Sequence, residues 1–122
     1  MKKLYALRGA AQCLNTRQDI CHQVLTMYEE LLNRNKLDES DIVSAIFSVT
    51  SDLDAINPCT ALRMSGKAAN TALFGVQEPQ TEGALERTVR AMIHCYLEEG
   101  VKVCHVYRNG AQVLRPDIAQ DI

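Results

Sequence analysis

Six residues with charged or phenolic side chains could together bind a small anion. They are Arg8, Arg63, Glu78, Arg90, Tyr107 and Arg115. An arginine presents a planar fork of donors that matches a carboxylate, whereas a glutamate accepts hydrogen bonds from hydroxyl groups. Any one of these arginines is more often a surface or ion-pair residue than a ligand contact, by roughly two to one. Their recurrence near the ends of expected strands favours a shared site.

The segment from His105 to Asp117 carries two of these residues and the clearest turn signal. Asn109-Gly110 stands between two apolar runs, and this dipeptide tolerates the positive φ angles of a tight type I′ turn. The sequence therefore predicts a β-hairpin. Tyr107 and Arg115 would lie near its open end, where both could reach one carboxylate.

Motifs for several other chemistries are absent from the sequence. GxSxG, GxGxxG and the P-loop do not occur, which argues against a serine nucleophile and against nucleotide binding. The histidines at positions 22, 94 and 105 have no metal-ligand spacing, so we expect no metal. The cysteines at positions 13, 21, 59, 95 and 104 include no CxxC pair, and we expect reduced thiols that pack as small core residues.

Length and charge narrow the class of protein. The 122 residues fit a single domain over 1–122, small enough that an extended site could need a neighbouring subunit. The 13 basic and 15 acidic residues make no broad positive field, so neither nucleic acid nor a membrane surface is an expected partner. Arg8 interrupts the apolar start before a signal-peptide core is complete, and no run of about 18 apolar residues occurs. We therefore expect a cytoplasmic protein.

The first half of the chain predicts two strands and a long helix. Residues 4–7 are apolar and predict a short strand. Residues 16–34 begin with Thr16 and Asp19, a loose capping box, and continue with apolar residues at steps of three and four. This pattern predicts a helix that covers a sheet. Residues 42–49 are β-branched and apolar, which predicts a central strand buried on both faces.

The second half predicts a short helix, a strand and one ambiguous segment. A proline and a following glycine favour a helix over residues 58–65, and residues 71–76 read as a strand. Residues 84–97 fit both a helical stripe and a strand alternation, so periodicity leaves both open. As a strand, this segment would point Arg90 away from the core, toward a second layer or a ligand.

Short motifs also follow one another in an order typical of one family. They are Leu7-Arg8-Gly9-Ala10, Thr50-Ser51-Asp52-Leu53-Asp54-Ala55, Gln77-Glu78, Val89-Arg90, and His105-Val106-Tyr107 with Val113-Leu114-Arg115-Pro116-Asp117. Together they resemble the monofunctional chorismate mutases of the trimeric barrel type. The resemblance runs from about residue 4 to residue 118, and the pair of motifs at the C-terminal end is its most specific part.

The resemblance implies an α+β fold and a reaction without a cofactor. The expected fold is a mixed five-stranded β-sheet packed on one long helix, with three subunits forming a pseudo-α/β-barrel and a site at each interface. In that family residues 87–97 form a strand, and we adopt this assignment. The implied reaction is the Claisen rearrangement of chorismate to prephenate in phenylalanine and tyrosine biosynthesis.

The resemblance also implies a role for each candidate residue. Arg90 would stand beside the ether oxygen, Arg8 would hold the substrate compact, and Glu78 would accept from the ring hydroxyl. Tyr107 and Arg115 would bind a carboxylate. The further substrate-binding positions that it implies are Asn57, Cys59, Thr60, Arg63, Leu73, Phe74, Gly75 and Leu114.

Three of these positions depart from the family pattern. Asn57 replaces an aromatic residue before the proline, Thr60 stands where some members have a lysine, and Gly75 replaces a cysteine. These changes predict a more polar wall. An alternative is therefore a non-catalytic protein on the same fold that binds a small aromatic or dicarboxylate metabolite. A third reading, the enamine/imine deaminase group with a similar trimeric barrel, rests on fold analogy alone.

Overall fold

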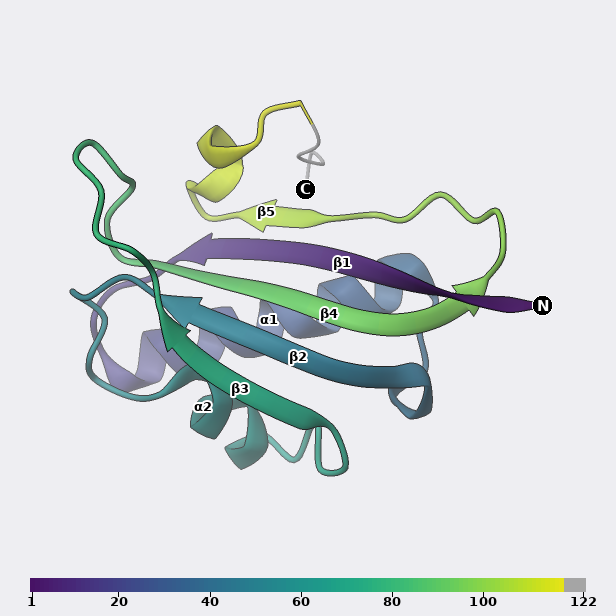
Figure 1. Cartoon of the computed structure of the whole chain (residues 1–122). Helices are drawn as coiled ribbons and strands as arrows, with labels where there is room; N and C mark the ends of the chain where they lie inside the picture. The colour runs from purple at the N-terminus through teal and green to yellow at the C-terminus, as the bar shows by residue number, and fades with distance from the viewer. Residues whose placement is uncertain (118–122) are drawn as a thin grey trace.

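A mixed five-stranded sheet and two helices make up the structure, a computed structural model that describes residues 1–117 (Figure 1). The elements are β1 (Lys2–Gln12), α1 (Arg17–Asn35), the 3₁₀ turn η1 (Glu39–Asp41), β2 (Ile42–Val49), α2 (Pro58–Met64), β3 (Ala72–Gln77), β4 (Thr88–Glu98), β5 (Val106–Arg108) and the 3₁₀ turn η2 (Ala111–Leu114). The strand order is β3-β2-β4-β1-β5. β4 runs antiparallel to β1 and β2, while β3 and β5 pair in parallel with β2 and β1. The α+β expectation is confirmed.

α1 begins where its sequence predicts and packs closely on β1. The Thr16 hydroxyl accepts a hydrogen bond from the backbone N–H of Asp19, at 3.1 Å, which satisfies one of the free donors of the first turn. The apolar stripe of the helix is buried in the core. A Cβ atom at Gly9 of β1 would lie only 2.9 Å from the sulfur of Met27, so any side chain here would have to push the Met27 side chain aside.

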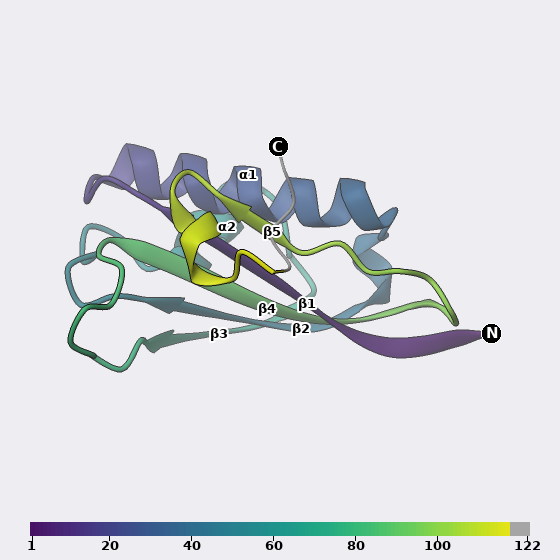
Figure 2. The same cartoon turned by 90° about the horizontal axis from the view of Figure 1, so that it is seen from above.

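β4 lies in the middle of the sheet. It shows that the segment for which periodicity allowed either a helix or a strand is a strand. Its residues alternate, with Val89, Ala91, Ile93, Cys95 and Leu97 buried. The intervening residues, Arg90 among them, lie on the other face. Both helices cover the same side of the sheet, so residues 1–117 place no covering layer on this other face (Figure 2).

Two expectations about strands need correction. Residues 42–49 do form a strand, but β4 rather than β2 occupies the middle, and Val43 and Ile46 remain exposed because no helix covers their side of the sheet. β1 extends from residue 2 to residue 12, well beyond the expected 4–7, because all of these residues pair with β4.

The predicted hairpin at Asn109-Gly110 is wrong, although the turn itself is present. Both residues have positive φ, at 53° and 101°, as a type I′ turn needs. The chain then enters η2 instead of a second strand. β5 pairs instead with the edge of β1, and the side chain of Asn109 donates to the carbonyl of Gln12 at 2.6 Å. The turn therefore bends the chain back over β1.

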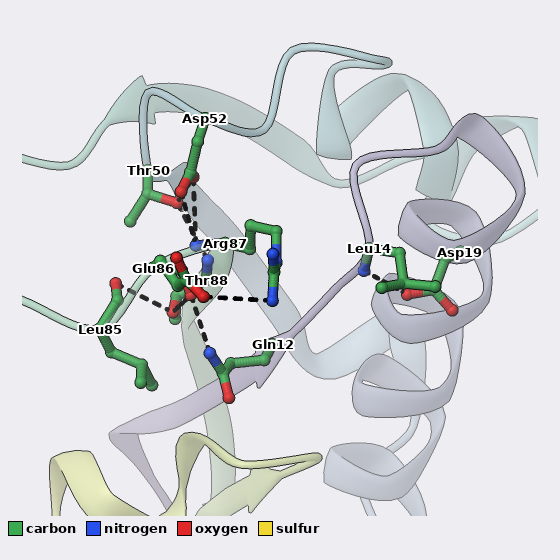
Figure 3. Close-up of polar contacts among 9 residues, drawn as sticks. All are labelled: Gln12, Leu14, Asp19, Thr50, Asp52, Leu85, Glu86, Arg87 and Thr88. Atoms are coloured by element: carbon green, nitrogen blue, oxygen red, sulfur yellow. Dashed lines mark hydrogen bonds and ion pairs between the residues drawn. The ribbon is translucent and has the colours of Figure 1, made fainter.

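A cluster of polar contacts connects the end of β2 with the start of β4 (Figure 3). The Asp52 carboxylate accepts from the backbone N–H of Arg87 with both oxygens, at 3.0 and 3.1 Å, and from the Thr50 hydroxyl. Arg87 has a φ of 44°, in the left-handed region, so these bonds hold a backbone position that most residues avoid. The cluster fixes the position from which β4 starts toward Arg90.

Within residues 1–117, no helix is both long enough and apolar enough to cross a bilayer.

Candidate active site

A hollow of about 400 Å³ opens on the uncovered face of the sheet. Its polar lining comes from β1, β2, β4 and β5 and from the segments that follow β3 and η2. These polar residues are Arg8, Ser48, Glu78, Arg90, Tyr107 and Arg115. Ile46, Val76 and Met92 supply much of the apolar floor. The structure thus brings together five of the six residues from which the sequence predicted an anion site.

Glu78 and Arg90 form an ion pair at the wall of this hollow. The backbone N–H of Glu78 donates to the carbonyl of Val49, at 2.8 Å, which anchors the residue to the end of β2. Its carboxylate oxygen Oε1 accepts from the Ser48 hydroxyl at 2.5 Å and lies 3.5 Å from Nε of Arg90. The Arg90 side chain is 44% exposed and faces the hollow. A cation and an anion therefore stand side by side at its wall.

Arg8 is positioned through its backbone by a histidine. The N–H of Arg8 donates to Nδ1 of His105 at 3.0 Å, just before β5 pairs with β1. Burial lowers the pKa of His105 below its usual value, and the positive charges of Arg8 and Arg115 lower it further. The ring is thus neutral at pH 7, with Nδ1 as the acceptor.

Tyr107 and Arg115 come together through η2 rather than through a hairpin. Tyr107 is buried with Ala10 and Ala111, and Leu114 packs against this small cluster. Arg115 donates from Nε and Nη2 to the two carboxylate oxygens of Asp117, at 3.0 and 2.7 Å. This hydrogen bonding raises the pKa of Arg115 above its usual value. The predicted convergence of the two side chains on one hollow holds, although the predicted route to it does not.

The remaining candidate residues lie apart from this hollow. Asn57 and Gly75 line a second hollow of about 320 Å³, between the start of α2 and β3. Cys59 is buried beside it. The others line neither hollow, and they are Thr60, Arg63, Leu73 and Phe74. Of the six residues from which the sequence predicted an anion site, Arg63 is thus the one that does not line the first hollow.

Sequence reasoning missed Ser48, which lines the first hollow, and His105, which accepts a hydrogen bond from the backbone of Arg8. Ser48 lies opposite Arg90 in the register of β2 and β4, and this register is not readable from either segment alone. His105 belongs to a motif that was noticed, but its partner is a backbone group with no sequence signature. Alternation along the strand from 42 to 49 would have placed Ser48 on the face away from the core.

The thiols are free in the structure, and three of them are buried. Burial raises the pKa of Cys13 to about 12 and that of Cys95 to about 11, so neither is a ready nucleophile. Within residues 1–117, no three histidine, cysteine or acidic side chains are grouped in a way that could hold a metal ion.

Comparisons with known proteins agree with this geometry. Residues 4–118 match the family model of chorismate mutase type I. The chain is 27% identical over 115 residues to the chorismate mutase AroH of Bacillus subtilis, covering 93% of this chain and 91% of that protein. Its structure matches that of a chorismate mutase from Clostridium thermocellum with a TM-score of 0.83 and 40% identity, over 89% of this chain and 98% of the other. The chain therefore belongs to the type I chorismate mutase family.

Proposed function

We propose that this protein catalyses the rearrangement of chorismate to prephenate, in the biosynthesis of aromatic amino acids in the cytoplasm. The chain belongs to the family, and the main support for this function in the structure is that Arg8, Arg90 and Arg115 line the same hollow. Chorismate carries two carboxylates, and a site with several guanidinium groups matches such a dianion.

The rearrangement makes and breaks bonds in one pericyclic step. The ether C–O bond breaks ahead of full C–C bond formation, so negative charge gathers on the ether oxygen in the transition state. A fixed cation beside that oxygen stabilises the transition state more than the bound substrate and so lowers the barrier. The step needs no nucleophile and no proton transfer.

We assign the ether oxygen to Arg90, which is partly exposed and lines the hollow. Arg8 and Glu78 complete the catalytic set: Arg8 helps to hold the flexible substrate in its reactive conformer, and Glu78 accepts from the ring hydroxyl. Folding a flexible dianion into that conformer is itself a share of the rate enhancement. Tyr107 and Arg115 bind a carboxylate, and because Asp117 engages Nε and Nη2 of Arg115, we expect the ligand on the Nη1 side.

The second group of candidate residues is assigned to a neighbouring subunit in a homotrimer. Five large apolar side chains on the uncovered sheet face are exposed by 38% to 66% in the single chain, namely Leu4, Ile46, Phe74, Val76 and Tyr96. Apolar faces of this kind mark interfaces between protein subunits. Packing this face against two further copies would bury it. The resemblance puts residues 57–60 of one subunit against Arg90 of the next, so Asn57, Arg63, Phe74 and Gly75 would complete the neighbour's site.

The departures at Asn57 and Gly75 are linked to each other. Asn57 Oδ1 accepts from the backbone N–H of Cys59, at 2.8 Å, and so caps α2. A Cβ atom at Gly75 would lie 3.3 Å from this same oxygen, a tight contact. The two changes therefore fit together, and they supply a polar wall in place of an aromatic and a thiol group.

A chorismate assay tests this function. The purified protein is expected to consume chorismate, followed by its absorbance, with the appearance of prephenate. The alternative of a non-catalytic binder of a small aromatic or dicarboxylate metabolite predicts a different result: chorismate raises the melting temperature of the protein without turnover. That result would replace the enzymatic proposal with the binding one.

A further inference from the structure

Ser48 is a buried hydroxyl at the wall of the catalytic hollow. Ser48 is only 8% exposed, and it is one of three buried polar residues among those that the structure describes. It stands one position before the end of β2 and pairs directly with Arg90 of β4, with Val76 of β3 on its other side. Its side chain therefore shares the uncovered sheet face with Arg90.

The proton of this hydroxyl is already in use. Ser48 Oγ donates to Oε1 of Glu78, at 2.5 Å. A serine has one proton to donate, so this bond leaves Ser48 without a donor for a ligand. Val49, the next residue of β2, accepts from the backbone N–H of Glu78 with its carbonyl, at 2.8 Å. Together the two hydrogen bonds fix both the backbone and the side chain of Glu78.

Oε1 of Glu78 also lies near the guanidinium group of Arg90. Nε of Arg90 lies 3.5 Å from Oε1 of Glu78, too far for a strong hydrogen bond but close enough for attraction. If Oε1 lost the hydroxyl of Ser48, Arg90 would be the nearest donor able to replace it. The guanidinium would then turn toward Glu78, and its charge would be partly neutralised where the reaction needs it.

We propose that Ser48 is a positioning residue: by donating to Oε1 of Glu78, it keeps this carboxylate from closing onto Arg90. Arg90 then keeps its charge for the ether oxygen, and Glu78 presents its other oxygen to the ring hydroxyl. This inference rests on the proposed function and extends it to a residue that touches no reacting atom.

The test compares Ser48→Ala and Ser48→Thr with a matched control, Ser44→Ala. Threonine keeps the hydroxyl, whereas Ser44 lies on the same strand and face but outside the hollow, with its hydroxyl near His94. Ser48→Ala is expected to lower kcat about 10-fold to 100-fold, the usual effect of losing a hydrogen bond to a charged group, with a smaller change in KM. Ser48→Thr should recover most of this loss, and Ser44→Ala should stay close to wild type.

A double-mutant cycle separates positioning from mere support of the fold. If Ser48 acts through Glu78, Ser48→Ala has little further effect on kcat once Glu78→Ala is present. An equal loss of kcat in both backgrounds overturns the proposal. So does a Ser48→Ala enzyme that keeps wild-type kcat, or a Ser48→Thr enzyme that folds with an unchanged melting temperature but is no more active than Ser48→Ala.

Turnover by the wild-type protein is measured first. A wild type that does not convert chorismate contradicts the proposed function and this inference together. Wild-type kcat in Ser48→Ala, measured in an active enzyme, contradicts only the inference.

Discussion

His105 connects the titration of its own ring to the placement of Arg8, for which we propose a catalytic role. Its Nδ1 accepts from the backbone N–H of Arg8, and this bond exists only while the ring is unprotonated at that nitrogen. Protonation would remove the acceptor and add a third positive charge next to Arg8 and Arg115. The chemical step moves no proton, so His105 is the residue through which we expect acid pH to act on this site.

His105→Asn is expected to remove part of the acid sensitivity of the protein. The side-chain oxygen of asparagine can accept from Arg8 in place of Nδ1 but does not titrate near neutrality. Because the folded state lowers the pKa of His105 below 6.5, the unfolded chain binds this proton more readily. The stabilising contribution is complete above about pH 6.5 and is lost as the pH falls toward the lowered value.

The measurement is the melting temperature and kcat/KM of both proteins between about pH 7.5 and 5. The wild type should lose more of both than His105→Asn does. Carboxylates elsewhere titrate alike in the two proteins, so their effects cancel in the difference. Parallel pH curves would show that His105 plays no part.

Among the helices and strands, the sequence predicted correctly those segments whose apolar residues repeat with the period of the element that they form. α1 starts at a true cap and buries a regular stripe, and its predicted range of 16–34 is close to the observed helix. The sequence of β4 fits both the helical period and the strand alternation, and only its pairing in the middle of the sheet decides between them. At Asn109-Gly110 the local turn was predicted correctly, but β5 pairs with the distant β1 instead of its own neighbour. Such pairings over long sequence distances leave no local signal, so the hairpin was wrong and the contacts of Ser48 and His105 were missed.

Asp52→Ala is expected to destabilise the connection that leads into β4. The carboxylate of Asp52 accepts from Thr50 and from the N–H of Arg87, and these bonds support the left-handed backbone at Arg87. Burial opposes the charge of Asp52, but these hydrogen bonds outweigh it and lower its pKa below 3.8. The melting temperature of Asp52→Ala should therefore lie a few degrees below that of the wild type at pH 7.

The difference between the two proteins should also depend on pH. A lowered carboxyl pKa stabilises the folded state above about pH 4, and this contribution is lost as the pH falls through the lowered value. Thermal melts at pH 7 and at pH 3.5 check this, with Glu82→Ala as a control that removes an exposed carboxylate from the next loop. Equal destabilisation at both pH values would show that the charge of Asp52 does not matter.

In the molecule as a whole, residues 1–117 leave Arg63 outside the hollow and one apolar face of the sheet uncovered. Arg8, Glu78, Arg90, Tyr107 and Arg115 meet in one hollow, whereas Arg63 lies elsewhere on α2. The family resemblance implies that residues 57–60 of one subunit lie against Arg90 of the next, and we propose that Arg63, on the same helix, belongs to that neighbouring site. Contacts between subunits leave no local signal in the sequence of one chain. Apolar faces and split sites together favour a closed assembly with cyclic symmetry.

Mixing two damaged subunits tests this shared site. Light scattering should give the mass of a trimer, and Arg90→Ala and Arg63→Ala should each be impaired. In mixed trimers, about one interface in four receives an intact Arg90 from one subunit and an intact Arg63 from the next. Unfolding and refolding the two variants together should therefore recover activity up to about a quarter of the wild-type level. A stable active monomer, or no recovery beyond the sum of the separate variants, would rule out sites shared between subunits.

The kcat of Arg90→Ala on chorismate tests the proposed electrostatic catalysis. In the proposed mechanism Arg90 acts on charge that develops only in the transition state, so its removal must lower kcat and not merely raise KM. The kcat of Arg90→Ala should fall by at least about 10²-fold to 10³-fold, the usual effect of removing one preorganised donor, with a melting temperature close to that of the wild type. Arg90→Lys should remain strongly impaired, because lysine keeps the charge but loses the planar fork and its preset geometry. A folded Arg90→Ala protein with wild-type kcat would contradict electrostatic catalysis by Arg90.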